Sequence, residues 1–316
     1  MASDLESVTV AIANQNLNEK EVLKNGDHAS LNSEDTEDAG GFGQLSESNG
    51  LGSSYARMPV EKDAVRYNMN HPSRGHCVIF NHSIFDSHTG LGARNGTDKD
   101  RDQAQQLFKN LGYKVAVYNN EPVERIKEVI QDLAFGVDHK DCDSLVIVFM
   151  SHGEQEILYG RNGSFKAEFL FDSFSADQCK SLAGKPKLFF IQACRGEGLD
   201  PGTTLVNTGP KDETDAGSLS YKIPNTADFL ICWSTVPGHF SWRNTTNGSW
   251  FIQSLVRVLS AQSAHDDLLS MMTDVNRYMI LHFESNCPSQ QHMHGKKQVA
   301  SIVSTLMRKV YLTPKY

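Results

Sequence analysis

The chain has 316 residues, of which 39% are hydrophobic and 22% are charged, so it can bury one sizeable α/β core and still leave a tail or linker. No run approaches the roughly 18 apolar residues of a membrane span. Residues 1–15 have neither a basic start nor a long apolar centre, which excludes a recognisable secretory signal. We therefore expect a cytoplasmic protein without a membrane partner.

The net charge of −8 is distributed unevenly along the chain. Residues 1–56 hold ten acidic and two basic residues, which leaves 28 acids against 28 bases in the remainder. This formally neutral remainder gives no reason to expect a nucleic-acid partner. The acidic head is rich in Ser, Asn and Gly and poor in aromatic residues, which predicts a disordered segment.

Six cysteines are spread along the chain without a CxxC pair or a regular spacing. This pattern argues against a zinc site and against a disulfide framework, so we expect neither a metal nor another cofactor. Cys77 and Cys232 lie inside apolar runs, where a free cysteine normally behaves as a small core residue.

From residue 75 onward, strand-like and helical patterns alternate. The first half predicts a strand over 77–80, a helix over 98–110 with Thr97 as its N-cap, a strand over 114–118, a helix over 122–135 and a strand over 144–150. Residues 195–220 have no periodicity and indicate an exposed loop. The patterns then predict a strand over 227–233, helices over 248–259 and 266–280, and a strand over 299–306. Short apolar strands between helices indicate a mainly parallel sheet with helices on both faces.

Two apolar runs lead into residues that can perform chemistry. The run over 188–191 is followed by Cys194, and the run over 145–150 is followed by His152. A thiol attacks a peptide carbonyl as the thiolate, and a nearby imidazole can take the thiol proton and return it to the departing amine. Each residue alone is more often a buried thiol or an ordinary loop histidine. Their placement after two buried strands favours a shared site.

Residues 192–196 read Gln-Ala-Cys-Arg-Gly, and a histidine lies 42 residues before the cysteine, a known signature of the caspases. From about Arg57 to the C-terminus the chain resembles this family of cysteine proteases, which cut after aspartate. The resemblance implies a caspase-like α/β fold: a three-layer sandwich whose mainly parallel six-stranded central sheet has helices on both faces and extends across a dimer.

The resemblance also implies the catalytic roles. Cys194 would be the nucleophile and His152 the general base. The backbone N–H groups of Gly153 and Cys194 would hold the oxyanion, and a backbone carbonyl near Gly92 would orient the histidine.

For the P1 aspartate of a protein substrate, the resemblance implies a pocket with two arginines, because planar guanidinium groups hold a carboxylate best. Arg94 and Arg243 stand in the matching motifs, and Gln192 and Ser151 complete the pocket.

The resemblance assigns Phe240 and Trp242 to the P2 pocket, and Asn244 and Trp250 to recognition of the P4 residue. The chain departs from the family in two places. His239 stands where a tyrosine is usual, and residues 286–294 lack the aromatic that effector enzymes place beside these pockets. The preference beyond P1 aspartate therefore stays open.

Two Asp-x-x-Asp tetrapeptides precede an alanine, one ending at Asp215 and the other at Asp38. Because such sites are what the resembled enzymes cut, we expect a zymogen that an upstream initiator caspase activates at both aspartates. The expected parts are a disordered prosegment over 1–38, a large catalytic subunit over 39–215 and a small subunit over 216–316. The small subunit would carry the pocket loop and the strand that forms a homodimer.

The short head has no room for a folded recruitment domain of about 80 to 100 residues, which favours an executioner of apoptosis. Removal of the head would expose Ala39-Gly40-Gly41-Phe42, which loosely resembles the Ala-led peptides that inhibitor-of-apoptosis proteins bind.

Two other functions compete with this one. A catalytically inactive caspase-like regulator would dimerise with active caspases, but such chains usually lose a catalytic or pocket residue, and here all of them are present. A related cysteine peptidase that cuts after arginine or lysine would need acidic residues in its P1 pocket, whereas Arg94 and Arg243 are basic.

Overall fold

The structure, a computed structural model, describes residues 56, 58–202 and 224–315. The expected processing sites Asp38 and Asp215, the Ala39 terminus and most of the loop expected over 195–220 lie outside the described residues.

The core of the molecule is a six-stranded sheet with the strand order β11-β8-β7-β3-β1-β2. Five strands are parallel, and β11 alone runs antiparallel to its neighbour β8. The strands are β1 (Ser73–Asn81), β2 (Lys114–Asn119), β3 (Cys142–Met150), β7 (Lys187–Gln192), β8 (Phe229–Trp233) and β11 (Ser301–Ser304). The predicted mainly parallel six-stranded sheet is confirmed.

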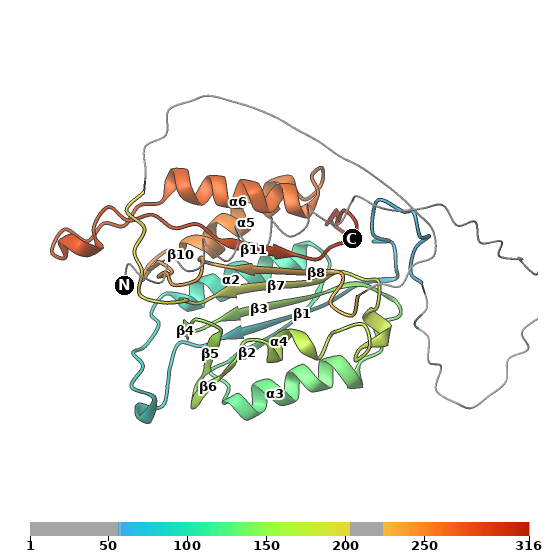
Figure 1. The fold of residues 1–316 in the computed structure, drawn as a ribbon, viewed down its shortest axis with the longest axis horizontal. Helices are drawn as coiled ribbons and strands as arrows, with labels where there is room; N and C mark the ends of the chain where they lie inside the picture. Colours follow the sequence, from blue (N-terminus) through green and yellow to red (C-terminus); the bar gives the residue numbers. More distant parts are fainter. Residues whose placement is uncertain (1–55, 57, 203–223, 316) are drawn as a thin grey trace, which may run out of the picture. The chain divides into compact units, whose positions relative to one another are not determined.

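Helices cover both faces of this sheet, which gives the three layers seen in Figure 1. One face carries α2 (Thr97–Asn110), α5 (Trp250–Gln262) and α6 (Leu268–His282), and the other carries α3 (Val123–Gln131) and α4 (Phe169–Asp172). Three single turns of 3-10 helix lie at Ser87–Thr89, Lys180–Leu182 and Gln291–Met293. None of the helices in the described residues is long and apolar enough to cross a membrane.

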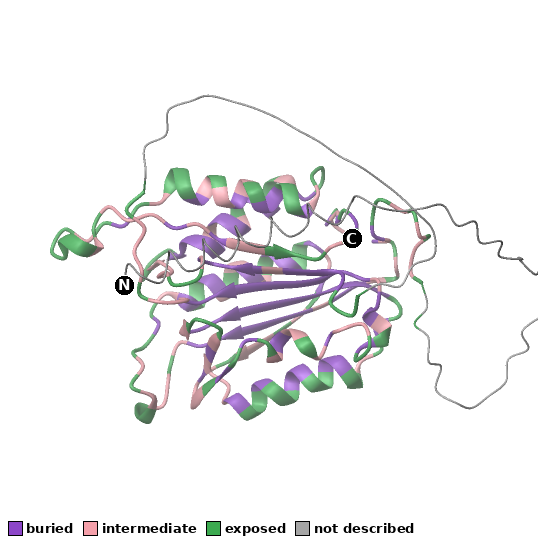
Figure 2. Cartoon of the chain, viewed as in Figure 1, coloured by how far each residue is buried: buried purple, intermediate pink, exposed green. Residues whose placement is uncertain are grey.

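The two central strands are the most deeply buried part of the sheet (Figure 2). All nine residues of β3 and all six of β7 are buried, as expected for parallel strands covered on both faces. Both strands end at the same side of the sheet, because Met150 pairs with Gln192 in parallel register.

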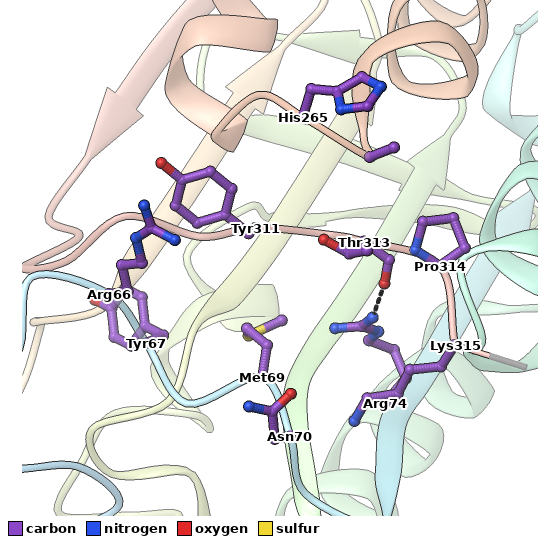
Figure 3. Close-up of a pocket in the computed structure, with 11 residues that line it drawn as sticks. Arg66, Tyr67, Met69, Asn70, Arg74, His265, Tyr311, Thr313, Pro314 and Lys315 are labelled. Atoms are coloured by element: carbon purple, nitrogen blue, oxygen red, sulfur yellow. Dashed lines mark hydrogen bonds between the residues drawn. The ribbon is translucent and has the colours of Figure 1, made fainter.

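At the opposite edge, where the parallel strands begin, Arg74 ties β1 to the C-terminal segment (Figure 3). Its Nε donates to Leu111 O at 3.1 Å, its Nη2 donates to Thr313 O, and its Nη1 lies 3.2 Å from Asp143 Oδ2. A cavity of about 470 Å³ opens beside this group. Lys315 also lines it, and its Nζ is bonded to His71 O at 2.6 Å. Because the buried Arg74 and the half-buried Lys315 already have partners, they serve as a structural cross-link, and the cavity beside them is not a candidate active site.

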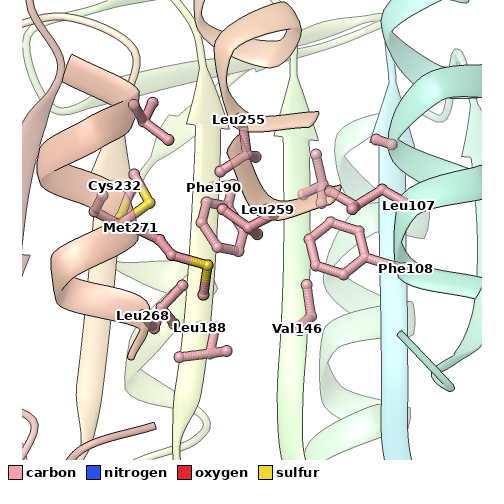
Figure 4. Close-up of a cluster of buried hydrophobic side chains, with 14 of the residues drawn as sticks. Leu107, Phe108, Val146, Leu188, Phe190, Cys232, Leu255, Leu259, Leu268 and Met271 are labelled. Atoms are coloured by element: carbon pink, nitrogen blue, oxygen red, sulfur yellow. The ribbon is translucent and has the colours of Figure 1, made fainter. Parts of the chain in front are cut away.

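Alternation along the strands sends successive side chains to two separate cores. Val146, Leu188 and Phe190 face α2, α5 and α6, whereas Ile147 and Phe189 face α3 and α4. Figure 4 shows the first of these cores, in which Phe108 of α2 and Met271 of α6 close over the strands.

One local prediction is wrong. Thr97 is the first residue of α2 and not its N-cap, because its hydroxyl donates to Asn81 Oδ1 at 2.8 Å and accepts from Arg94 Nη1 at 3.0 Å. The cap position belongs to Gly96, which has a φ of 87° that favours glycine. The helix expected over 122–135 is confirmed: α3 runs to Gln131, and the chain continues as one π-helical turn over Asp132–Gly136.

Two small sheets were not predicted. One follows His152 and consists of β4 (Gly153–Glu154), β5 (Ile157–Gly160) and β6 (Gly163–Lys166). The other is the hairpin of β9 (Arg243–Asn244) and β10 (Gly248–Ser249), which precedes α5. Strands of two to four residues are too short to show the alternation that sequence patterns depend on. Both sheets contribute residues to the candidate site.

Candidate active site

His152 and Cys194 leave the sheet side by side. The Ser151 N–H donates to Gln192 O at 3.1 Å, which continues the pairing of β3 and β7 beyond the strands. A Cβ built on Gly153 would lie 2.8 Å from Cys194 O and 2.9 Å from Ala193 Cβ. Real Cβ atoms do not approach backbone this closely, so a glycine is required where the histidine segment crosses the cysteine segment.

The His152 ring is oriented by a backbone carbonyl. Its Nε2 lies 2.8 Å from Gly92 O, the carbonyl that was expected near this position. Because a carbonyl oxygen only accepts, Nε2 carries the proton and Nδ1 is left free to act as a base. Burial lowers the pKa of His152, the bond to Gly92 partly opposes this, and the charges of Arg94 and Arg243 lower it further. The neutral base is therefore favoured.

Cys194 is half-buried and contacts the backbone of Ser241. The Ser241 N–H points at Sγ with an N···S distance of 3.4 Å, and Sγ lies 3.8 Å from Ser241 O. Four other cysteines are buried, and burial raises their pKa so that they stay as thiols: Cys77, Cys142, Cys179 and Cys232.

The two predicted oxyanion donors are the backbone N–H groups of Gly153 and Cys194. Tyr159 N–H donates to His152 O at 3.2 Å, so the next pair of the β4–β5 ladder, Gly153 with Leu158, is a non-hydrogen-bonded pair. The Gly153 N–H therefore points away from β5. The Cys194 N–H donates to no group within the described part of the chain. Both N–H groups can therefore donate to the oxyanion of a bound substrate.

Arg94 and Arg243 are two desolvated arginines, and the charge of Arg243 lowers the pKa of Arg94. Arg94 is 1% exposed, and its Nη1 donates to His82 O at 2.8 Å and to Thr97 Oγ1 at 3.0 Å. Burial, followed by the charge of Arg243, lowers the pKa of Arg94 to about 9. Arg243 donates from Nε to Asn95 O at 2.9 Å, and burial lowers its pKa as well. Two desolvated guanidinium groups of this kind attract a carboxylate.

Gln192 and Ser151 lie at the strand ends between the cysteine and the histidine. Gln192 is buried and donates from Nε2 to Ser241 Oγ at 2.7 Å, while its Oε1 has no partner among the described residues. The Ser151 hydroxyl donates to Tyr159 O at 2.6 Å. Gln192 therefore connects β7 to the segment that leads to Arg243.

The predicted P2 and P4 residues fall into two groups. Phe240 and Trp242 line a small cavity together with His239. Trp242 stacks on Trp250 with ring centroids 5.6 Å apart, but Trp250 is 7% exposed and belongs to the core. The Asn244 Oδ1 accepts from the backbone N–H groups of residues 246 and 247, so it closes the turn of the β9–β10 hairpin.

Two residues near the site were not predicted. Phe283 stacks on Trp250 with centroids 5.5 Å apart, just before the segment over 286–294. Asp100 is a fully buried carboxylate beneath the arginines, and its Oδ1 accepts from Ser249 N–H at 2.8 Å. Helical spacing could have revealed Asp100, because it lies four residues before the buried Ala104 on the same face of α2.

Comparison with known proteins agrees with this geometry. Residues 74–311, more than half of the chain, match the family model described as the caspase domain. The chain is 49% identical over 254 residues to Caspase-1 of Spodoptera frugiperda, covering 80% of this chain and 83% of that protein. It is 40% identical over 277 residues to Caspase drICE of Drosophila melanogaster, covering 85% and 80% respectively.

A solved structure points the same way. The crystal structure of Caspase-1 from Spodoptera frugiperda superimposes with a TM-score of 0.76 at 47% identity, covering 82% of this chain and all of that one. The α/β sandwich, the shared strand edge and these relatives lead to one conclusion: the chain belongs to the caspase family and is a cysteine-type endopeptidase.

Proposed function

We propose that this endopeptidase cuts proteins after aspartate at DExD-like sites and that it executes apoptosis in the cytoplasm. The observation that carries the proposal is the position of Arg94 and Arg243. Both are desolvated cations, Arg243 Nε donates at 2.9 Å to the carbonyl of Asn95, the residue that follows Arg94, and the charges of both lower the pKa of His152. A substrate carboxylate held by this pair would therefore lie close to the nucleophile.

The reaction follows from the groups at the strand ends. His152 Nδ1 takes the proton of the Cys194 thiol, and the thiolate sulfur bonds to the carbonyl carbon of the P1 residue. The carbonyl oxygen gains the negative charge and accepts from the N–H groups of Gly153 and Cys194. When the C–N bond breaks, protonated His152 gives its proton to the amine. A water molecule, deprotonated by His152, then hydrolyses the thioester and releases the free thiol.

Selection of P1 aspartate comes from charge and hydrogen bonding in the pocket. Arg94 and Arg243 each keep N–H donors that are not used by the backbone carbonyls they bind. We assign Gln192, which donates to Ser241 two residues before Arg243, and Ser151 to the same pocket. P1 asparagine has the same shape as aspartate but lacks the charge, so it leaves the positive charge of the arginine pair without a counter-charge from the substrate.

For the remaining pockets we propose that Phe240 and Trp242 receive the P2 side chain, and that Asn244 and Trp250 serve the P4 residue. The stack of Trp242 on Trp250 supports a common aromatic wall for these pockets. Phe283 extends this stack from a segment that follows α6.

We propose further that the chain is a zymogen with a prosegment over 1–38, a large subunit over 39–215 and a small subunit over 216–316. An upstream initiator caspase would cleave after Asp215 and Asp38, and a new N-terminus at Ala39 would be offered to inhibitor-of-apoptosis proteins. The exposed edge strand β11, with Val303 51% exposed, is the proposed homodimer contact.

The deciding experiment is cleavage of a fluorogenic Asp-Glu-Val-Asp peptide by the purified protein, both intact and after deliberate cleavage at Asp215. Cys194→Ala and a peptide with asparagine at P1 are the controls. We expect activity that both controls abolish. If the wild type stays silent in both forms, the chain is instead a catalytically inactive regulator that dimerises with active caspases.

A further inference from the structure

Asp100 is a buried carboxylate in the first turn of α2. It is completely shielded from solvent, whereas the side chains of Asp98 and Asp102 on the same helix are 59% and 62% exposed. An ionised carboxylate is costly to bury unless nearby groups compensate its charge. The surroundings of Asp100 therefore indicate what holds it there.

Its direct partner is the β9–β10 hairpin. Asp100 Oδ1 accepts from Ser249 N–H at 2.8 Å, and a Cβ at Gly248 would overlap this oxygen. Ser249 is paired with Arg243 across the hairpin. One hydrogen bond thus connects α2 to the strand that lies opposite the second arginine.

The same two segments touch at two further points. Arg243 Nε donates to Asn95 O at 2.9 Å, and a Cβ at Gly96 would lie 2.7 Å from Thr245 O. Asn95 and Gly96 directly follow Arg94 in the chain. The distance between the two arginines therefore depends on how the hairpin is seated against residues 94–100.

The charge of Asp100 also belongs to this group. Burial raises the pKa of Asp100 to about 6, while the Ser249 N–H and the charges of Arg94 and Arg243 oppose the rise. Oδ2 accepts no hydrogen bond in the described part of the chain, so neither arginine bonds to it directly. Two arginines and one carboxylate leave one net positive charge, which a P1 carboxylate would cancel.

We propose that Asp100 is a positioning residue that ties the β9–β10 hairpin to α2 and so sets the spacing of Arg94 and Arg243 around the P1 carboxylate. Asp100 acts through the arginines and touches no substrate itself. The inference rests on the proposed specificity for P1 aspartate, which it deepens.

The test compares three variants by steady-state kinetics on a peptide with aspartate at P1. Asp100→Ala removes the tether, and we expect KM to rise about tenfold while kcat stays within about threefold. Asp100→Asn keeps an oxygen that can accept from Ser249 N–H, so its KM should stay within about threefold of the wild type. Asp102→Ala is the matched control on the exposed face of the same helix and should change neither constant.

A fourth variant covers the case in which Asp100→Ala does not fold. Asp100→Glu keeps the charge but lengthens the tether by one methylene, so it should displace the hairpin and weaken the preference for P1 aspartate over P1 glutamate. An unchanged preference in Asp100→Glu contradicts the proposal.

The rate at which iodoacetamide alkylates Cys194 gives a readout that needs no P1 contact. We expect this rate to be unaffected in Asp100→Ala. A loss of kcat and of alkylation together would indicate general damage and overturn the inference, as would an unchanged KM. If the wild type alkylates normally but cuts no P1-aspartate peptide, the proposed function fails, and the inference fails with it.

Discussion

The strand ends that carry His152 and Cys194 are built differently from the loops that carry Arg94 and Arg243. The first two residues follow β3 and β7, which are buried along their whole length and hydrogen-bonded on both sides. The arginines are held by a few bonds from side chains to backbone carbonyls. The chemical step therefore depends on the core of the sheet, whereas recognition of P1 depends on local contacts between two loops.

The largest effect should come from the strand ends. His152→Ala removes the proposed general base, and we expect kcat to fall by roughly 10³-fold with little change in KM. The melting temperature should stay close to that of the wild type, because the ring is only half-buried. Kinetics combined with thermal unfolding checks this, and a rise in KM of similar size would contradict the separation of the two regions.

A smaller effect, on KM and not on kcat, is expected from the loops that carry the two arginines. Arg94→Lys keeps the positive charge but loses the planar fork of donors, so kcat/KM should fall roughly 30-fold, chiefly through KM. Arg257→Lys on the exposed side of α5 is the matched control and should have no effect. The idea of a P1 arginine pair would have to be abandoned if Arg94→Lys lowered kcat alone.

Gly153→Ala tests the crossing of the two strand ends. The added Cβ would press on Cys194 O, so the cysteine backbone must shift and kcat should fall about tenfold through poorer oxyanion geometry. Gly163→Ala in β6 provides the control, since a Cβ there meets nothing within 4 Å. Equal activity of the two variants would show that the close approach at Gly153 does not matter.

The smallest effect concerns pH. Because burial and the two arginines lower the pKa of His152, the neutral base persists below the usual imidazole range. The kcat/KM profile should therefore keep its plateau as pH falls past about 6.5 and drop only at lower pH, when His152 becomes protonated. Arg243→Gln removes one of the cations, so it should move this acid limb to higher pH. If the acid limb of Arg243→Gln stayed at the pH of the wild type, Arg243 would not be a cause of the lowered pKa of His152.

The sequence predicted those parts of the site that follow from long runs of apolar residues. The apolar runs before His152 and Cys194 predicted two buried strands, and the parallel register then brought both residues to one edge. The carbonyl expected near Gly92 also lies where the histidine can reach it.

Sequence reasoning failed where three-dimensional contacts decide. Thr97 looks like a helix cap, but Arg94 and Asn81 use its hydroxyl. Asp100 is an aspartate like the exposed Asp98 and Asp102 on the same helix. Its contact with the β9–β10 hairpin, through Ser249 N–H, is visible only in the three-dimensional structure. Phe283 lies outside the segment where an aromatic was expected, although it joins the same stack of rings.

Strand β8 lies between β7 and β11, so the residues after the 203–223 segment complete a sheet whose other strands come mostly from before it. Helices α5 and α6 likewise pack on the core formed by β3 and β7. If the chain were opened within 203–223, the two polypeptides would be joined by a shared sheet and a shared core. Unfolding would then separate two molecules, so the melting temperature of the opened protein would rise with its concentration.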